Sequence, residues 1–204
     1  QMLRLENAAT SAQLTMLRYQ LNPHFLFNTL NSISTLVLLK QTEQANAMLS
    51  RLSSFLRFTL INEAEAKVTL AQEVETLKLY LDIEKMRFEE RLRTFFDIDP
   101  ATTNALVPSL LLQPLVENAI KYAVTPKEDG ADISVQTQLV GQKLRIIVSD
   151  TGLGLQPGQQ DLSLSTGVGM ANTRERLMQA YGDDQLFRAS VRPGGGFEVL
   201  IEMP

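Results

Sequence analysis

The sequence predicts an α+β fold in two parts, with a helical hairpin first and an α/β sandwich after it. Residues 1–62 contain almost no glycine or proline and repeat apolar residues at three- and four-residue spacing, as helices do. From about residue 67 the pattern changes, and short apolar segments typical of strands alternate with helical ones. We therefore expect a helical domain at 1–66 and a sandwich domain at 67–204, joined by a linker at 62–66.

Pro23 interrupts the helical part. Proline lacks a backbone donor, so we expect the helix to restart there, with Asn22 as N-cap and Pro23 at the first helical position. A second helix is expected at about 43–61. The hairpin has more apolar surface than two helices can bury between them, which predicts a homodimer in the form of a four-helix bundle. The residues on which this rests are Leu26, Leu30, Ile33, Leu49, Leu52 and Phe55.

The second part opens with the sequence Thr69–Gln72, which is typical of a capping box. The helix that follows is expected to reach about Glu90. Helices covering one face of a mainly antiparallel sheet would give the sandwich. The remaining elements expected are strands at 93–98, 133–139, 144–148, 185–192 and 197–203, helices at 108–123 and 170–181, and a glycine-rich loop at about 151–169.

The composition excludes several kinds of chemistry. The chain of 204 residues has no cysteine and one histidine, which excludes disulfides, thiolate catalysis, cysteine-zinc sites and histidine-rich metal sites. The net charge of −4 gives no sign of a surface for nucleic acid. A metal, if present, should therefore be a hard cation on oxygen ligands, and magnesium is the ion expected.

His24 is that single histidine, and it lies in the apolar segment Gln20–Asn31. An imidazole has a pKa of about 6.5 in model peptides, so its neutral form is an available nucleophile at pH 7. A buried structural histidine is the ordinary interpretation in an apolar stretch. The polar-striped helix and glycine loops that follow favour a phosphoacceptor instead.

Four polar residues form a stripe on the helix expected at 109–123: Glu117, Asn118, Lys121 and Tyr122. An amide oxygen can bind magnesium and a lysine can meet phosphate. An ordinary amphipathic helix with a solvated face would show the same pattern.

Asp150 ends an apolar strand and is followed by Gly152 and Gly154. A carboxylate there can accept a hydrogen bond from an exocyclic amine, and the glycines let backbone approach a ligand. A turn with an aspartate cap is one alternative. Asp-Thr-Gly is also the tripeptide of aspartic proteases, which would need a dimer to pair two aspartates.

Gly167, Gly169 and Met170 precede the last expected helix. Backbone amides at a helix N-terminus favour phosphate, although a lone G-x-G motif is common.

Together these segments resemble the LytS-like family of sensor histidine kinases over nearly the whole chain. Gln20–Asn31 is similar to the phosphoacceptor motif of that family. The segments Pro108–Lys121, Asp150–Gly154 and Gly167–Met170 resemble the N, G1 and G2 boxes of the wider GHKL superfamily of ATP-binding proteins. The resemblance implies a Bergerat-type ATP fold from about residue 67 and a dimeric hairpin before it.

The resemblance also implies roles for single residues. His24 would accept the γ-phosphoryl group of ATP, Glu117 is a candidate base, and Asn28 would orient water for dephosphorylation of a partner; local hydrogen bonding is the alternative for Asn28. Asn118 would bind Mg²⁺. The residues implied to bind the nucleotide are Asn118, Lys121, Tyr122, Asp150, Gly152, Gly154, Gly167, Gly169 and Met170.

Two positions depart from common sensor-kinase patterns. Phe25 follows the histidine where many sensor kinases have an acid, as is usual in this subfamily. Tyr122 follows Lys121 where the N box often has a histidine.

The partner implied is the receiver domain of a response regulator, often one with a LytTR-type DNA-binding domain, so the kinase itself need not bind nucleic acid. No segment approaches the roughly 20 apolar residues of a membrane span, and we expect no signal peptide. Because the chain begins at Gln1 in a helical pattern, we expect the cytoplasmic portion of a membrane-anchored sensor. A GHKL-type ATP-binding switch or scaffold without histidine phosphorylation is the alternative function.

Overall fold

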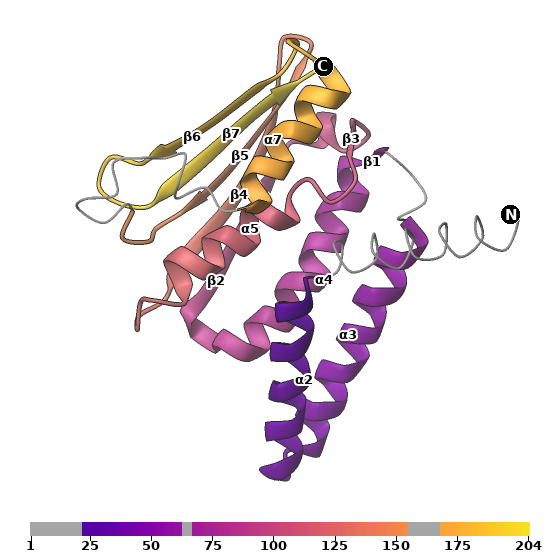
Figure 1. Cartoon of the computed structure of the whole chain (residues 1–204), viewed down its shortest axis with the longest axis vertical. Coiled ribbons are helices and arrows are strands. Elements are labelled where there is room, and N and C mark those ends of the chain that lie inside the picture. The colour runs from indigo at the N-terminus through magenta and orange to yellow at the C-terminus, as the bar shows by residue number, and fades with distance from the viewer. Residues whose placement is uncertain (1–21, 63–66, 155–167) are drawn as a thin grey trace, which may run out of the picture. The chain divides into compact units, whose positions relative to one another are not determined.

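The computed structural model describes residues 22–62, 67–154 and 168–204 (Figure 1). The chain forms two compact units, Gln1–Ser53 and Ser54–Pro204, which are described here one at a time. The expected domain boundary at residue 66 stays a prediction. The expected helix before Pro23 and most of the expected linker lie outside the described residues.

The first unit contains helix α2 (Pro23–Leu38) and the greater part of α3 (Thr42–Asn62). The side-chain oxygen of Asn22 accepts hydrogen bonds from the backbone N–H groups of His24 and Phe25, at 3.1 and 3.3 Å. Asn22 is therefore the N-cap and Pro23 the first helical residue, which confirms the prediction at this helix start. The second helix is confirmed within one residue at each end.

The second unit is built on a sheet of five strands in the order β2-β4-β5-β7-β6. Only β2 and β4 run parallel; the other three neighbouring pairs are antiparallel, as predicted. The strands are β2 (Leu92–Ile98), β4 (Ala131–Val140), β5 (Lys143–Asp150), β6 (Leu186–Val191) and β7 (Phe197–Met203).

Three helices lie on one face of this sheet: α4 (Leu70–Phe88), α5 (Gln113–Ala119) and α7 (Val168–Tyr181) (Figure 1). The predicted capping box opens α4, because the Thr69 side chain accepts from the N–H of Gln72 and the Gln72 side chain accepts from the N–H of Thr69. The helices and the sheet bury a shared apolar core that includes Leu77, Leu81, Val116, Ile133, Ile146, Leu177 and Ile201.

The start predicted for the helix at 108–123 was wrong. Pro108 ends a short strand, β3 (Leu106–Pro108), which pairs antiparallel with β1 (Lys67–Thr69). The chain then turns, and α5 begins only at Gln113. Neither three-residue strand was predicted, because strands this short carry no readable alternation.

The other end of this helix also differs from regular α geometry. Residues Ile120–Val124 form a π-helical turn, η3, that continues α5. The described part of this unit also contains two 3₁₀ turns, η1 (Glu89–Arg91) and η2 (Pro100–Thr102). Within the described ranges, no helix is both long and apolar enough to cross a membrane.

Candidate functional site

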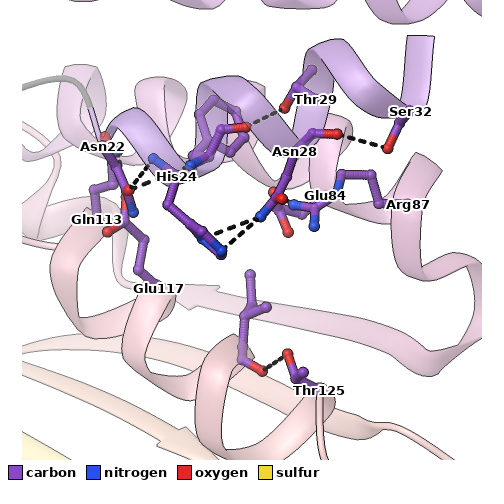
Figure 2. A network of polar contacts seen from close by, with 12 residues as sticks. Asn22, His24, Asn28, Thr29, Ser32, Glu84, Arg87, Gln113, Glu117 and Thr125 are labelled. Carbon is purple, nitrogen blue, oxygen red and sulfur yellow. Dashed lines mark hydrogen bonds and ion pairs between the residues drawn. The ribbon is translucent and has the colours of Figure 1, made fainter. Parts of the chain in front are cut away.

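His24 is exposed on the first turn of α2 (Figure 2). The amide nitrogen of Asn28, one turn later, lies 3.1 Å from its Nδ1 and 3.2 Å from its Nε2. The amide can donate to whichever ring nitrogen carries no proton. The two side chains thus share one helix face, as the spacing of four residues predicted, and the imidazole is open to a reaction partner.

Phe25 stands next to His24, where many sensor kinases have an acid, and it is buried although His24 is exposed. Its side chain is 4% exposed, and its backbone carbonyl accepts from the Thr29 hydroxyl at 2.8 Å (Figure 2). The Phe25 side chain supplies no proton-accepting group next to His24.

The polar stripe predicted on α5 continues into the π-turn. Glu117 and Asn118 are half-buried on α5, whereas Lys121 and Tyr122 are exposed on η3, with the lysine Nζ 4.9 Å from the tyrosine ring centroid. The wider turn is closed by Thr125, which donates from its N–H and its hydroxyl to the Ile120 carbonyl. The last two members therefore depart from the regular helical spacing, and such π-turns often occur at functional sites.

Glu117, the candidate base, lies in a polar setting within the second unit. Its Oε1 accepts from the Gln113 amide at 2.8 Å (Figure 2). On α4 the buried Glu84 accepts from Arg87 at 2.6 Å. Burial raises the pKa of Glu84, Arg87 opposes the rise, and the charge of Glu117 adds to it. Glu117 is thus close enough to Glu84 for their charges to interact.

Asp150 lies at the end of β5 and is 6% exposed. Its Oδ1 accepts from the backbone N–H groups of Gly152 and Phe197, at 2.8 and 3.2 Å, and Arg192 donates to its backbone carbonyl. Burial raises the pKa of Asp150, while the two backbone donors and Arg192 oppose the rise. Among the described residues, the hydrogen bonds to this carboxylate all go to Oδ1.

Two glycines bring backbone close to this aspartate. A Cβ at Gly152 would lie 2.6 Å from the Cβ of Ala123, so the turn after Asp150 packs against the end of η3. A Cβ at Gly196 would overlap the Asp150 carbonyl, and its φ is +91°. From the sequence we predicted only the strands at 185–192 and 197–203 that flank Gly194–Gly196. Gly196, Phe197 and Arg192 were therefore missed as neighbours of the site, and the run of three glycines was the one available signal.

The predicted G2 segment is described only in part. Gly167 lies outside the described residues. A Cβ at Gly169 would lie 3.4 Å from the Pro114 side chain, so the start of α7 approaches the start of α5. Met170 is 2% exposed and belongs to the core, and Gly154, with φ of +70°, follows the Asp150 turn. Contact of these residues with a nucleotide stays a prediction.

Two family models match adjoining parts of the chain. Residues 12–92 match the model described as histidine kinase, and residues 104–204 match the model of histidine kinase-, DNA gyrase B-, and HSP90-like ATPases. The sensor histidine kinase YesM of Bacillus subtilis is 34% identical over 94% of this chain. The sensor protein LytS of Enterococcus faecalis is 33% identical over 95% of it.

The chain belongs to the LytS- and YesM-type sensor histidine kinases. This confirms the family resemblance found in the sequence. The chain spans about a third of these relatives, 33% of YesM and 34% of LytS. It is the catalytic core of such a kinase, and the second match implies that residues 104–204 bind ATP.

Solved structures support the fold. The histidine kinase domain of the blue-light activated kinase EL346 from Erythrobacter litoralis has a TM-score of 0.54 at 19% identity, and the match covers 95% of this chain and 93% of that one. The catalytic domain of the histidine kinase ThkA has a TM-score of 0.53 at 16% identity and covers 68% of this chain and 93% of its own. N-terminal helices followed by an α/β sandwich are therefore confirmed.

The residues near the predicted magnesium site can be compared with the ligands that the metal requires. Among the residues that the structure describes, no group of three or more histidine, aspartate or glutamate side chains could hold a metal ion. Mg²⁺ commonly takes one or two protein oxygens and completes its shell with water and substrate phosphates. The half-buried amide of Asn118 fits a site of that kind.

Proposed function

We propose that this core transfers the γ-phosphoryl group of ATP to His24 and then to an aspartate of a response-regulator receiver domain. One observation carries the proposal: the single imidazole of the chain is exposed and has the Asn28 amide beside its ring nitrogens. An exposed, oriented imidazole suits a group that must meet first a nucleotide and then a partner protein.

The second unit would hold the nucleotide. Asp150 would accept the adenine amine at Oδ2, since Oδ1 is occupied by two backbone donors that fix the carboxylate plane. Lys121 would offset phosphate charge, and Asn118 would bind magnesium. When bound, Mg²⁺ would neutralise charge on the phosphates, which together with positioning supplies most of the catalysis of phosphoryl transfer.

The phosphoryl transfer to His24 needs no strong base. An unprotonated nitrogen of His24 forms a bond to the γ-phosphorus, the bond from that phosphorus to the β–γ bridging oxygen breaks, and ADP leaves with the bond electrons. The other ring nitrogen keeps its proton or loses it to a base, for which Glu117 is the candidate. In the second transfer a carboxylate oxygen of the regulator takes the phosphoryl group and the imidazole is restored.

We further propose that two chains form a homodimer through the hairpin. The response regulator, and not the kinase, would bind DNA. This core would lie in the cytoplasm, and any membrane anchor would belong to parts of the protein outside this sequence. The curated relatives, named as sensor proteins, are about three times as long as this chain, which leaves room for such parts.

Labelled ATP tests the proposal. After incubation with [γ-³²P]ATP and Mg²⁺, the protein should carry a label that is lost in acid and stable in alkali, as expected for a phosphorus–nitrogen bond. The label should then pass to a receiver domain. A protein that binds ATP but takes up no such label would instead be the ATP-binding switch or scaffold.

A further inference from the structure

The element that carries Asn118 is short. Helix α5 has only seven residues, and the π-turn η3 adds five more. An isolated helix of this length is unstable in water, so contacts at its ends must fix its position.

The N-terminal end is held by a buried carboxylate. Glu73, on α4, is 4% exposed; its Oε2 accepts from the N–H of Leu110 at 3.0 Å and its Oε1 from the N–H of Leu112 at 2.8 Å. The turn it holds is unusual, because Leu110 has a φ of +56°, which a leucine rarely adopts. Losing the carboxylate would leave buried amides without a partner.

Arg176, on α7, places a positive charge near the carboxylate of Glu73 at this end. Arg176 donates to the backbone carbonyls of Ser109 and Leu110. Burial raises the pKa of Glu73, whereas the backbone donors and the charge of Arg176 oppose the rise. A negative group beside the first amides of a helix is favoured by the helix dipole.

The C-terminal end is held by a cation. Arg91, in the turn η1 that directly follows α4, has its Nη2 2.9, 3.1 and 3.0 Å from the carbonyl oxygens of Val124, Thr125 and Lys127. A positive group is favoured at this end. The Nε of Arg91 is buried and makes no hydrogen bond with the described residues. Burying an unpaired donor costs free energy, which the three contacts of Nη2 must offset. Gly130 permits the approach, because a Cβ there would overlap the Arg91 carbonyl.

We propose that Glu73 and Arg91 are positioning residues that clamp the two ends of α5–η3 and thereby set Asn118 for magnesium-bound ATP. This rests on the proposed role of Asn118. Both residues belong to α4–η1, so α4–η1 contacts each end of α5–η3, the element that carries Asn118. A displacement of α4 would then change the affinity for magnesium-bound ATP.

Two variants with matched controls test the clamp. Glu73→Gln keeps the size of the side chain but places a donor against a backbone donor, and Arg91→Ala removes the cation. Arg91→Lys keeps the charge and should restore part of the function. The controls are Glu75→Gln and Lys85→Ala, both exposed positions on α4.

We expect both clamp variants to bind Mg·ATP about tenfold more weakly. The affinity for ATP in EDTA should fall less, because Asn118 contributes only through magnesium whereas Lys121, on the same element, contributes without it. Hydrogen exchange should rise in residues 113–124 and stay unchanged in β5. Equal weakening with and without magnesium, or faster exchange throughout the second unit, would mean a merely structural role and would overturn the inference.

Asn118→Ala separates this inference from the role on which it depends. It should show the same selective loss of Mg·ATP affinity without the change in hydrogen exchange. If the clamp variants loosen 113–124 but bind Mg·ATP normally, the inference is wrong. If Asn118→Ala also binds normally, the proposed magnesium role fails with it.

Discussion

The two regions proposed to carry the chemistry are built in opposite ways. The His24 region is local: Asn22 caps the helix two residues before His24, and Asn28 contacts the ring four residues after it. The Asp150 region depends on distant parts of the chain, since Phe197, 47 residues away, binds the carboxylate. The imidazole is exposed, whereas the carboxylate is buried.

This difference has a functional meaning. An exposed group on a capped helix can meet different partners in turn, and changing it should leave the rest of the protein intact. A buried carboxylate fixed by several donors is suited to recognise one ligand, and changing it disturbs its surroundings. Variants in the first region should therefore alter phosphoryl transfer alone, and variants in the second should alter nucleotide binding.

The largest effect is expected for assembly through the hairpin. Leu30 and Leu49 are each 50% exposed in a single chain. If a second hairpin covers them, each contributes part of the roughly 1.5–3 kcal/mol of a fully buried leucine, twice per dimer. Leu30→Ser with Leu49→Ser should weaken the dimer by at least about a hundredfold and leave ATP affinity unchanged.

Sedimentation at micromolar concentration gives this readout. The parent should sediment as two chains and the double variant as one. A parent that sediments as a single chain would contradict the bundle.

A second large effect is expected at the nucleotide site. Asp150→Asn replaces an acceptor with a group that can also donate, and it removes a charge-assisted hydrogen bond worth about 1.5–3 kcal/mol, so ATP affinity should fall about ten- to a hundredfold. Asn118→Asp should instead change the magnesium dependence. Calorimetric titration with ATP, with and without magnesium, measures the affinity and its magnesium dependence. Asp132→Asn, which changes an exposed ion pair with Arg93, is the control. Parent-like titrations of Asp150→Asn and Asn118→Asp would refute the site.

The pH dependence sharpens the contrast between the regions. Burial raises the pKa of Asp150 above its ordinary value of 3.8, so its carboxylate gains a proton at a higher pH than an exposed aspartate would. ATP affinity should therefore fall as the pH is lowered. Stability should respond in the opposite sense: with a folded pKa above the unfolded one, the contribution of this group is full below the unfolded pKa and is lost as the pH rises through the folded pKa.

Titrations of ATP at several pH values, with melting curves of the free protein, check both directions. The Asp150→Asn variant should lose this part of the pH dependence. A parent whose ATP affinity rises as the pH falls would contradict the assignment.

The smallest effect is expected from Asn28. Asn28→Ala removes the amide beside the imidazole but leaves His24 exposed on the same helix, so autophosphorylation should persist. The lifetime of the phosphorylated regulator should lengthen severalfold if the amide orients the attacking water, since positioning a single water accounts for part of such a rate. An unchanged lifetime, where the parent shortens it, would leave Asn28 as a local hydrogen-bond donor only.

Features set by near neighbours could be predicted from the sequence. The Asn22 cap, the Thr69–Gln72 capping box and the shared face of His24 and Asn28 all depend on residues two to four apart. The strands of the main sheet also follow from their alternation of apolar residues.

Features set by distant residues could not be predicted. The turn before α5 is bound by Glu73, which lies 37 residues before Leu110, and the end of η3 by Arg91, 33 residues before Val124. The same holds for Gly196, whose closeness to Asp150 depends on the pairing of β5 with β7. No local pattern announces such contacts.

We propose that phosphoryl acceptance and nucleotide recognition reside in separate regions of the chain. Measuring ATP affinity and acid-labile label in parallel on His24→Gln and Asp150→Asn tests it most directly. We predict that His24→Gln binds ATP with the parent affinity and takes up no label, and that Asp150→Asn loses affinity and, with it, label at sub-saturating ATP. Acid-labile label on His24→Gln, or parent-like ATP affinity in Asp150→Asn, would contradict the division.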